Sequence, residues 1–282
     1  MISKTEQKRK AATLLSLHDG GDLLILPNIW DPIGARILEV KGYPAVATAS
    51  AAISASLGYQ DGEKIKRQTV IDVIGRIARS VTIPLTADIE AGYGSTLSEL
   101  EDTARAVIEA GVVGVNLEDG LEDAASLRPI DDQCARIATM REAAARHGIH
   151  LVINARPDSF LSSSFESKAE AAEDAVARAE AYARAGADCI YPVGPGDEET
   201  VRELRARISS PINILGSPSA APLPVLQSIG VNRVSFGPFP FRSLLAKFAG
   251  IADTLKQKGD YSCIADRLTG AEVGAYLLDG PE

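Results

Sequence analysis

The chain has 282 residues and a formal net charge of −9, and 45% of its residues are hydrophobic. This length suffices for one large hydrophobic core or two modest ones. The acidic balance argues against nucleic acid or an anionic membrane as the main partner, and no run approaches the roughly 20 apolar residues of a membrane span. Cys134, Cys189 and Cys263 show no CxxC spacing, which predicts reduced thiols in a cytoplasmic protein without a zinc ribbon.

Short apolar runs alternate with helical patterns along the chain. An N-terminal helix precedes a strand at 23–28, and the next helix starts at Asp31-Pro32, where aspartate caps the helix and proline takes its first position. Thr96-Leu97-Ser98-Glu99 is a capping box that starts a later helix. Seven further apolar runs are predicted strands: 45–50, 81–88, 114–119, 151–156, 189–193, 211–215 and 233–236.

One sequence pattern recurs where a helix ends and the next strand begins: a glycine, then a few residues, then the next apolar run. It occurs at Gly42, Gly111, Gly186 and Gly230. Eight strands alternating with helices predict an α/β fold, a (β/α)8 or TIM barrel over residues 1–258. A doubly wound open sheet is the alternative.

Residues 259–282 exceed what such a barrel needs. We predict that they form a C-terminal helical extension that packs against a neighbouring subunit of a homo-oligomer, a dimer or a tetramer. The apolar residues that could be buried against a neighbouring subunit are Ile264, Leu268, Val273, Tyr276 and Leu277.

The third predicted strand ends in two carboxylates and a glycine-rich turn, Asp88-Ile89-Glu90-Ala91-Gly92-Tyr93-Gly94. Side chains alternate along a strand, so Asp88 and Glu90 are predicted to point the same way. Two carboxylates on one face repel each other unless a cation or a proton neutralises them. The alternative is an acidic loop that is simply solvated.

Other polar residues fall at the ends of neighbouring strands. In a TIM barrel these ends meet at one mouth, which holds the active site. The residues concerned are Ser50, Asp61, Asp88, Glu90, Asn116, Glu118, Asp119, Asn154, Arg156 and Asp158. Oxygen ligands with room for water suit Mg²⁺ or Mn²⁺, and an arginine suits a planar carboxylate. The pattern therefore predicts a site for a small acid that chelates a metal; alternatively, Arg156 forms an ion pair with Glu118 or Asp88 that only supports the barrel.

At these positions the sequence resembles the isocitrate lyase/phosphoenolpyruvate mutase superfamily. The resemblance covers roughly residues 10–255, and the matching segments are 27–31 (PNIWD), 47–52 (ATASAA), 56–62 (SLGYQDG), 88–94 (DIEAGYG), 115–119 (VNLED) and 154–156 (NAR). It implies a Mg²⁺-dependent barrel, with Mn²⁺ as a possible substitute, that acts on α-keto acids or their relatives. It also implies an oligomer whose subunits exchange the C-terminal helical extension.

The resemblance also implies roles for individual residues. Asp88 would bind the metal directly, while Asp61, Glu90 and Glu118 would hold metal-bound waters. Arg156 and Glu118 are the expected catalytic residues. The expected substrate-binding residues are Ser50, Ala51, Tyr93, Asn154 and Arg156.

One segment departs from the superfamily pattern. Lyases of the superfamily carry a Lys-Lys/Arg-Cys-Gly-His loop after the Glu-Asp strand, whereas residues 120–129 read GLEDAASLRP, without cysteine, histidine or lysine. We therefore predict a Mg²⁺-dependent lyase of a small α-keto acid, similar to an oxaloacetate decarboxylase, rather than an isocitrate or methylisocitrate lyase. Alternatives are a phosphoenolpyruvate mutase or phosphonopyruvate hydrolase, and a non-catalytic keto-acid-binding protein.

Overall fold

The computed structural model of the protein describes residues 2–19, 21–121 and 126–277. Two parallel sheets form its centre: β2-β3-β4-β5-β6-β7 has six strands and β1-β9-β8 has three. The strands are β1 Leu24–Leu26, β2 Asn28–Ile29, β3 Val46–Thr48, β4 Leu85–Asp88, β5 Gly114–Glu118, β6 Val152–Arg156, β7 Cys189–Ile190, β8 Asn213–Leu215 and β9 Arg233–Ser235.

The two sheets together follow one circular order. Pro27 separates β1 from β2 and has no N–H to donate, so the strand predicted at 23–28 is divided between the two sheets. On the opposite side, Ile190 of β7 forms a parallel bridge with Ile212, which directly precedes β8. The predicted α/β, TIM-barrel-type fold is therefore confirmed, and the open-sheet alternative is wrong.

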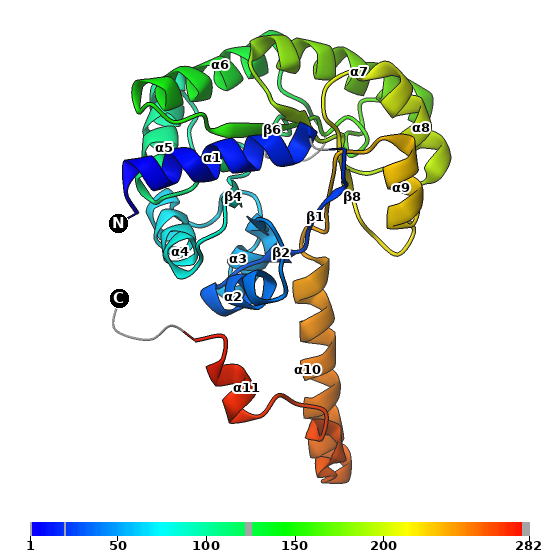
Figure 1. Ribbon diagram of the computed structural model, residues 1–282. Coiled ribbons are helices and arrows are strands. Elements are labelled where there is room, and N and C mark those ends of the chain that lie inside the picture. Colours follow the sequence, from blue (N-terminus) through cyan, green and yellow to red (C-terminus); the bar gives the residue numbers. More distant parts are fainter. Residues whose placement is uncertain (1, 20, 122–125, 278–282) are drawn as a thin grey trace.

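Helices surround the sheets (Figure 1). They are α1 Lys4–Asp19, α2 Pro32–Val40, α3 Ser50–Ser56, α4 Arg67–Ser80, α5 Leu97–Glu109, α6 Ile130–Arg146, α7 Lys168–Ala185, α8 Glu198–Arg207, α9 Leu223–Ile229, α10 Phe239–Lys258 and α11 Gly270–Gly274, with the 3-10 helix η1 Tyr261–Ile264. Asp31 caps α2, and Thr96 and Glu99 form both halves of the predicted capping box of α5. Among these described helices, none combines the length and apolarity required to cross a membrane.

The strands present apolar side chains to the helices and polar ones to the barrel axis. Val115 and Leu117 of β5 are fully buried in the main apolar cluster, whereas Asn116 and Glu118 between and after them pair with Asn154 and Arg156. The predicted alternation is thus confirmed, and it delivers polar groups to the carboxyl end of the strands.

Helix α1 closes the opposite end of the barrel. The Lys10 ammonium donates to the Val81 carbonyl at 2.9 Å, and the Gln7 amide donates to the carbonyls of Ile108 and Val112 at 2.7 and 3.1 Å. These carbonyls precede strands β4 and β5, so α1 seals their amino ends. The carboxyl ends remain as the accessible mouth.

Helix α10 projects from the barrel and α11 follows it outside (Figure 1). Within α10 only Phe241 is buried, while Leu244, Leu245 and Phe248 are 58%, 48% and 69% exposed. The projecting part includes α10, and the domain boundary at residue 258 stays a prediction; residues 278–282 of the predicted extension lie outside the described chain. Subunit exchange of this extension stays a prediction, supported by an apolar surface that water contacts unfavourably.

We expect Phe248→Glu, combined with Leu245→Glu, to shift the particle toward a monomer in light scattering, because the charges would prevent burial of this face. Truncation at Lys258 should act in the same direction. Lys247→Glu changes charge on the same helix without touching the apolar residues and should leave the particle mass unchanged. A monomeric unmodified protein would refute the exchange hypothesis.

Candidate functional site

Two neighbouring cavities lie at the carboxyl ends of the strands. The inner cavity, of about 170 Å³, is lined by Ser50, Asp88 and Asn116 among others, and the outer one has about 500 Å³. Asp61 and Arg156 line both. The strand ends thus bring most of the predicted site residues to one mouth, as the barrel fold requires.

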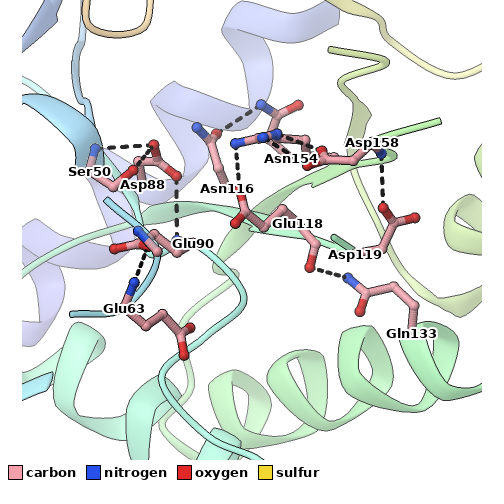
Figure 2. Close-up of polar contacts among 12 residues, drawn as sticks. Ser50, Glu63, Asp88, Glu90, Asn116, Glu118, Asp119, Gln133, Asn154 and Asp158 are labelled. Atoms are coloured by element: carbon pink, nitrogen blue, oxygen red, sulfur yellow. Dashed lines mark hydrogen bonds and ion pairs between the residues drawn. The ribbon is translucent and has the colours of Figure 1, made fainter. Parts of the chain in front are cut away.

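Asp88 ends β4 and is held beside the start of α3 (Figure 2). Its Oδ2 accepts hydrogen bonds from the Ser50 backbone N–H at 3.1 Å and from the Ser50 hydroxyl at 2.8 Å. The Asp88 N–H donates to the Thr48 hydroxyl at 2.9 Å. Ser50 and Ala51 begin a helix that the sequence did not predict, and both line the inner cavity.

Glu90 does not follow the strand alternation expected for it. The strand ends at Asp88, and Glu90 has a φ of 53°, so its side chain turns toward the segment after α3. Its carboxylate accepts from the N–H groups of Gly62 and Glu63 at 2.8 and 2.5 Å and from the Tyr93 hydroxyl at 2.6 Å. Burial raises the pKa of Glu90 to about 7, against the lowering effect of these donors.

Arg156, at the end of β6, lies between two carboxylates. It forms ion pairs with Glu118 and with Asp158, whose Oδ1 is 2.7 Å from Nε and whose Oδ2 accepts from Nη2 at 2.8 Å. Burial raises the pKa of Glu118 to about 8 and of Asp158 to about 6, while Arg156 opposes both shifts. The sequence allowed Arg156 a purely supporting role through an ion pair with Glu118, and this ion pair is present. Arg156 also lines both cavities.

The four carboxylates proposed for the metal repel one another. Asp88 raises the pKa values of Asp61, Glu90 and Glu118, although burial is the larger cause in each case. Among the described residues, no three or more histidine, cysteine, aspartate or glutamate side chains form a ready metal cage. The arrangement fits Mg²⁺, which keeps several waters and takes one or two protein carboxylates, better than a cation that needs a full protein cage.

A buried polar layer lies beneath the mouth. Asn154 Nδ2 donates to Asn116 Oδ1 at 2.8 Å (Figure 2). From β9, Arg233 Nη2 donates to the same oxygen at 3.3 Å. Asn154 is fully buried there and lines neither cavity, and the Tyr93 hydroxyl is bonded to Glu90. Direct contact of these two residues with the substrate stays a prediction.

Asp119 anchors the loop that carries Asp158. Its Oδ1 accepts from the Asp158 N–H at 2.8 Å, and its Oδ2 accepts from Arg178 at 3.0 Å and from the Tyr182 hydroxyl at 2.5 Å. Asp119 is fully buried and lines neither cavity. Its role is to fix the position of Asp158 and, through it, of Arg156.

The segment that replaces the lyase loop starts and ends close to Asp119. Gly120 and Leu127 form an antiparallel bridge, and the Arg128 N–H donates to the Asp119 carbonyl at 2.8 Å. Residues 122–125, within the segment 120–129 that departs from the lyase loop, lie outside the described chain. Gly120, Leu121 and Arg128 line the outer cavity.

Two residues of the inner cavity, Tyr191 and Arg242, were missed by the sequence reasoning. Tyr191 follows β7 directly, and its place after a strand was the signal that could have indicated it. Arg242 lies in the first turn of α10, which Asn28 holds at the mouth by accepting from the N–H groups of Phe236 and Gly237 at 2.7 and 2.9 Å. No local pattern links Asn28 to a residue more than 200 positions later.

The sequence model of the phosphoenolpyruvate phosphomutase family matches residues 14–256. The chain belongs to this family. The resemblance to the isocitrate lyase/phosphoenolpyruvate mutase superfamily is thereby confirmed.

Individual relatives in the family differ in reaction. The chain is 30% identical to oxaloacetate decarboxylase of Paraburkholderia xenovorans, over 78% of this chain and 72% of that protein. It is 29% identical to 2-methylisocitrate lyase of Bacillus subtilis, over 74% of this chain and 68% of that protein. Among solved structures, a Burkholderia cenocepacia protein provisionally assigned as a phosphonomutase has 36% identity and a TM-score of 0.83, covering 88% of this chain and 99% of that one.

Proposed function

We propose that this protein is a Mg²⁺-dependent lyase that decarboxylates a small 2-oxo diacid such as oxaloacetate. The observation that carries the proposal is the inner cavity, where Asp88, Ser50 and Arg156 surround a space of about 170 Å³. A carboxylate that can hold a cation and an arginine that can bind a planar carboxylate together suit a small acid that chelates a metal. The oxaloacetate decarboxylase among the relatives supports the same reaction class.

Mg²⁺, or Mn²⁺ in its place, would polarise the 2-oxo group as a Lewis acid. Asp88 would hold the metal directly. Asp61, Glu90 and Glu118 would hold its water ligands, since Glu90 and Glu118 are already bonded to other groups of the protein.

The chain's own cations would bind the acid and stabilise the enolate. Arg156 is positioned by Glu118 and Asp158 and is the proposed donor to the enolate oxygen. Ser50 and Ala51 would bind the first carboxylate. Arg242 lines the same cavity, and no described carboxylate forms an ion pair with it, so it is available to bind an anionic substrate.

The loop composition restricts which bond is broken. Cleavage of a 2-hydroxy tricarboxylate requires protonation of the departing carbanion, and positioned general acids typically contribute about 10²–10⁴-fold. Among the described residues, neither cavity is lined by a cysteine, so the loop acid expected in lyases of the superfamily is absent from both linings. Decarboxylation releases CO2 instead, so it needs no acid on the leaving group.

We expect measurable pyruvate formation from oxaloacetate and negligible cleavage of isocitrate or 2-methylisocitrate. A pyruvate-coupled assay with the metal added, compared with the same metal free in solution, measures the rate above background. Robust methylisocitrate cleavage would contradict the mechanism.

A phosphonopyruvate-directed activity is the second candidate, because the phosphonomutase assignment belongs to a relative at 36% identity. Phosphate release from phosphonopyruvate, or formation of a C–P product from phosphoenolpyruvate, would favour it over decarboxylation. A protein that binds 2-oxo acids with no turnover above free Mg²⁺ would instead be a binding protein. A cytoplasmic, homo-oligomeric protein remains part of the proposal, from the cysteine usage and the exposed face of α10.

A further inference from the structure

Tyr191 directly follows β7 and lies beside Arg156 of the neighbouring strand β6. Asn154 of β6 pairs with Cys189 of β7, and Ala155 with Ile190. The Tyr191 N–H continues the ladder by donating to the Ala155 carbonyl at 2.7 Å. In register, Tyr191 is therefore opposite Arg156, and residues opposite each other on parallel strands project to the same face.

This placement puts Tyr191 in the inner cavity with Asp88 and Arg156. Tyr191 is only 5% exposed, so the cavity is its contact with the outside. An occupant of the inner cavity is therefore within reach of this side chain.

Few groups in the inner cavity can give a proton to carbon. The described lining contains no histidine, cysteine or lysine, and its arginines stay protonated. Asp61 and Asp88 are proposed to serve the metal, and the Ser50 hydroxyl donates to Asp88. The remaining hydroxyls are those of Tyr191 and Ser235, of which the phenol is much the stronger acid.

We propose that Tyr191 is the general acid that protonates the enolate at C3, an assignment that rests on the proposed decarboxylase function. Cleavage of the bond between C3 and C4 leaves its electron pair in the enolate and releases CO2. The enolate then takes the proton of the Tyr191 hydroxyl at C3 as the 2-oxo group re-forms. The tyrosinate regains a proton from water.

The surroundings of Tyr191 suit this step. Burial raises the pKa of Tyr191 to about 12, while Arg156, Arg233 and a hydrogen bond with the Ser235 side chain oppose the rise. The phenol is thus protonated at neutral pH when the enolate forms. Ser235 and the nearby arginines would then stabilise the tyrosinate, and Ser235 is itself fixed by the Asn213 amide, which donates to it at 3.0 Å.

The test is the stereochemistry of protonation. The enzyme decarboxylates 3-methyloxaloacetate in D2O with the metal added, and lactate dehydrogenase with NADH traps the 2-oxobutyrate at once as 2-hydroxybutyrate. NMR then distinguishes the two diastereomers that carry deuterium at C3. We expect one diastereomer from the wild type and a near-equal mixture from Tyr191→Phe, with CO2 release persisting.

Exchange of the pyruvate methyl protons with D2O provides a second measurement. It should fall by about 10²–10⁴-fold in Tyr191→Phe, the usual contribution of a positioned general acid or base. Ser235→Ala should slow the exchange but still give one diastereomer, because Tyr191 remains in place. Tyr43→Phe removes a hydroxyl before β3, at the other end of the barrel, and should change neither result.

The outcomes separate the two proposals. Calorimetry measures the affinity of each variant for oxalate, which reports whether the inner cavity of that variant is intact. A Tyr191→Phe enzyme that still gives one diastereomer, or a Ser235→Ala enzyme that gives a mixture, would show that Tyr191 is not the acid while the decarboxylase function stands. A wild type that decarboxylates no 2-oxo acid would overturn the proposed function together with the Tyr191 assignment.

Discussion

Replacement of Arg156 by alanine should lower the rate of oxaloacetate decarboxylation by about two to three orders of magnitude. Arg156 is the proposed donor to the enolate oxygen, and loss of one such donor typically costs about 10²–10³ in kcat. The measurement is kcat and KM in the pyruvate-coupled assay, with the fold checked by circular dichroism.

Arg156→Ala must be compared with a second variant, because the substitution leaves the carboxylates of Glu118 and Asp158 without their shared cation. A buried carboxylate that loses its partner destabilises the fold. Arg156→Lys keeps the positive charge but loses the forked donor, so it should retain more stability than alanine and still lose most of the rate. An Arg156→Ala enzyme with an unchanged rate would exclude the proposed oxyanion role.

Asp88→Ala should abolish measurable Mg²⁺ binding in calorimetry while the barrel stays folded. Asp88 is the proposed direct ligand, and even the outer partners of metal ligands typically account for about 10–100-fold in affinity. Its loss would leave Asp61, Glu90 and Glu118 around a poorly held cation. Activity should fall in parallel and should not return at higher Mg²⁺ concentration.

The matched control is Asp22→Ala, an exposed carboxylate in the turn before β1, at the opposite end of the barrel. It changes the net charge by the same amount and should leave Mg²⁺ affinity as in the wild type. An Asp88→Ala protein that binds Mg²⁺ as well as the Asp22→Ala protein would show that the metal assignment is wrong.

Features that depend on local backbone geometry were predictable from the sequence. The caps at Asp31 and Thr96 form as predicted, because a capping side chain bonds to the chain only a few residues away. The alternation along β5 and β6 also holds, since a strand fixes it residue by residue. Glu90 is the exception: its left-handed backbone breaks the alternation two residues after Asp88.

By itself, the sequence determined the order of strands and helices, the barrel class, and the convergence of Asp88, Glu118 and Arg156 at one mouth. Those follow from periodicity and from the common orientation of parallel strands. Only the tertiary structure decided that Tyr191 and Arg242 line the inner cavity and that Arg233 supports Asn116 from 117 positions away. Such contacts join residues far apart in the chain, so they depend on how all the strands and helices pack together rather than on any local pattern.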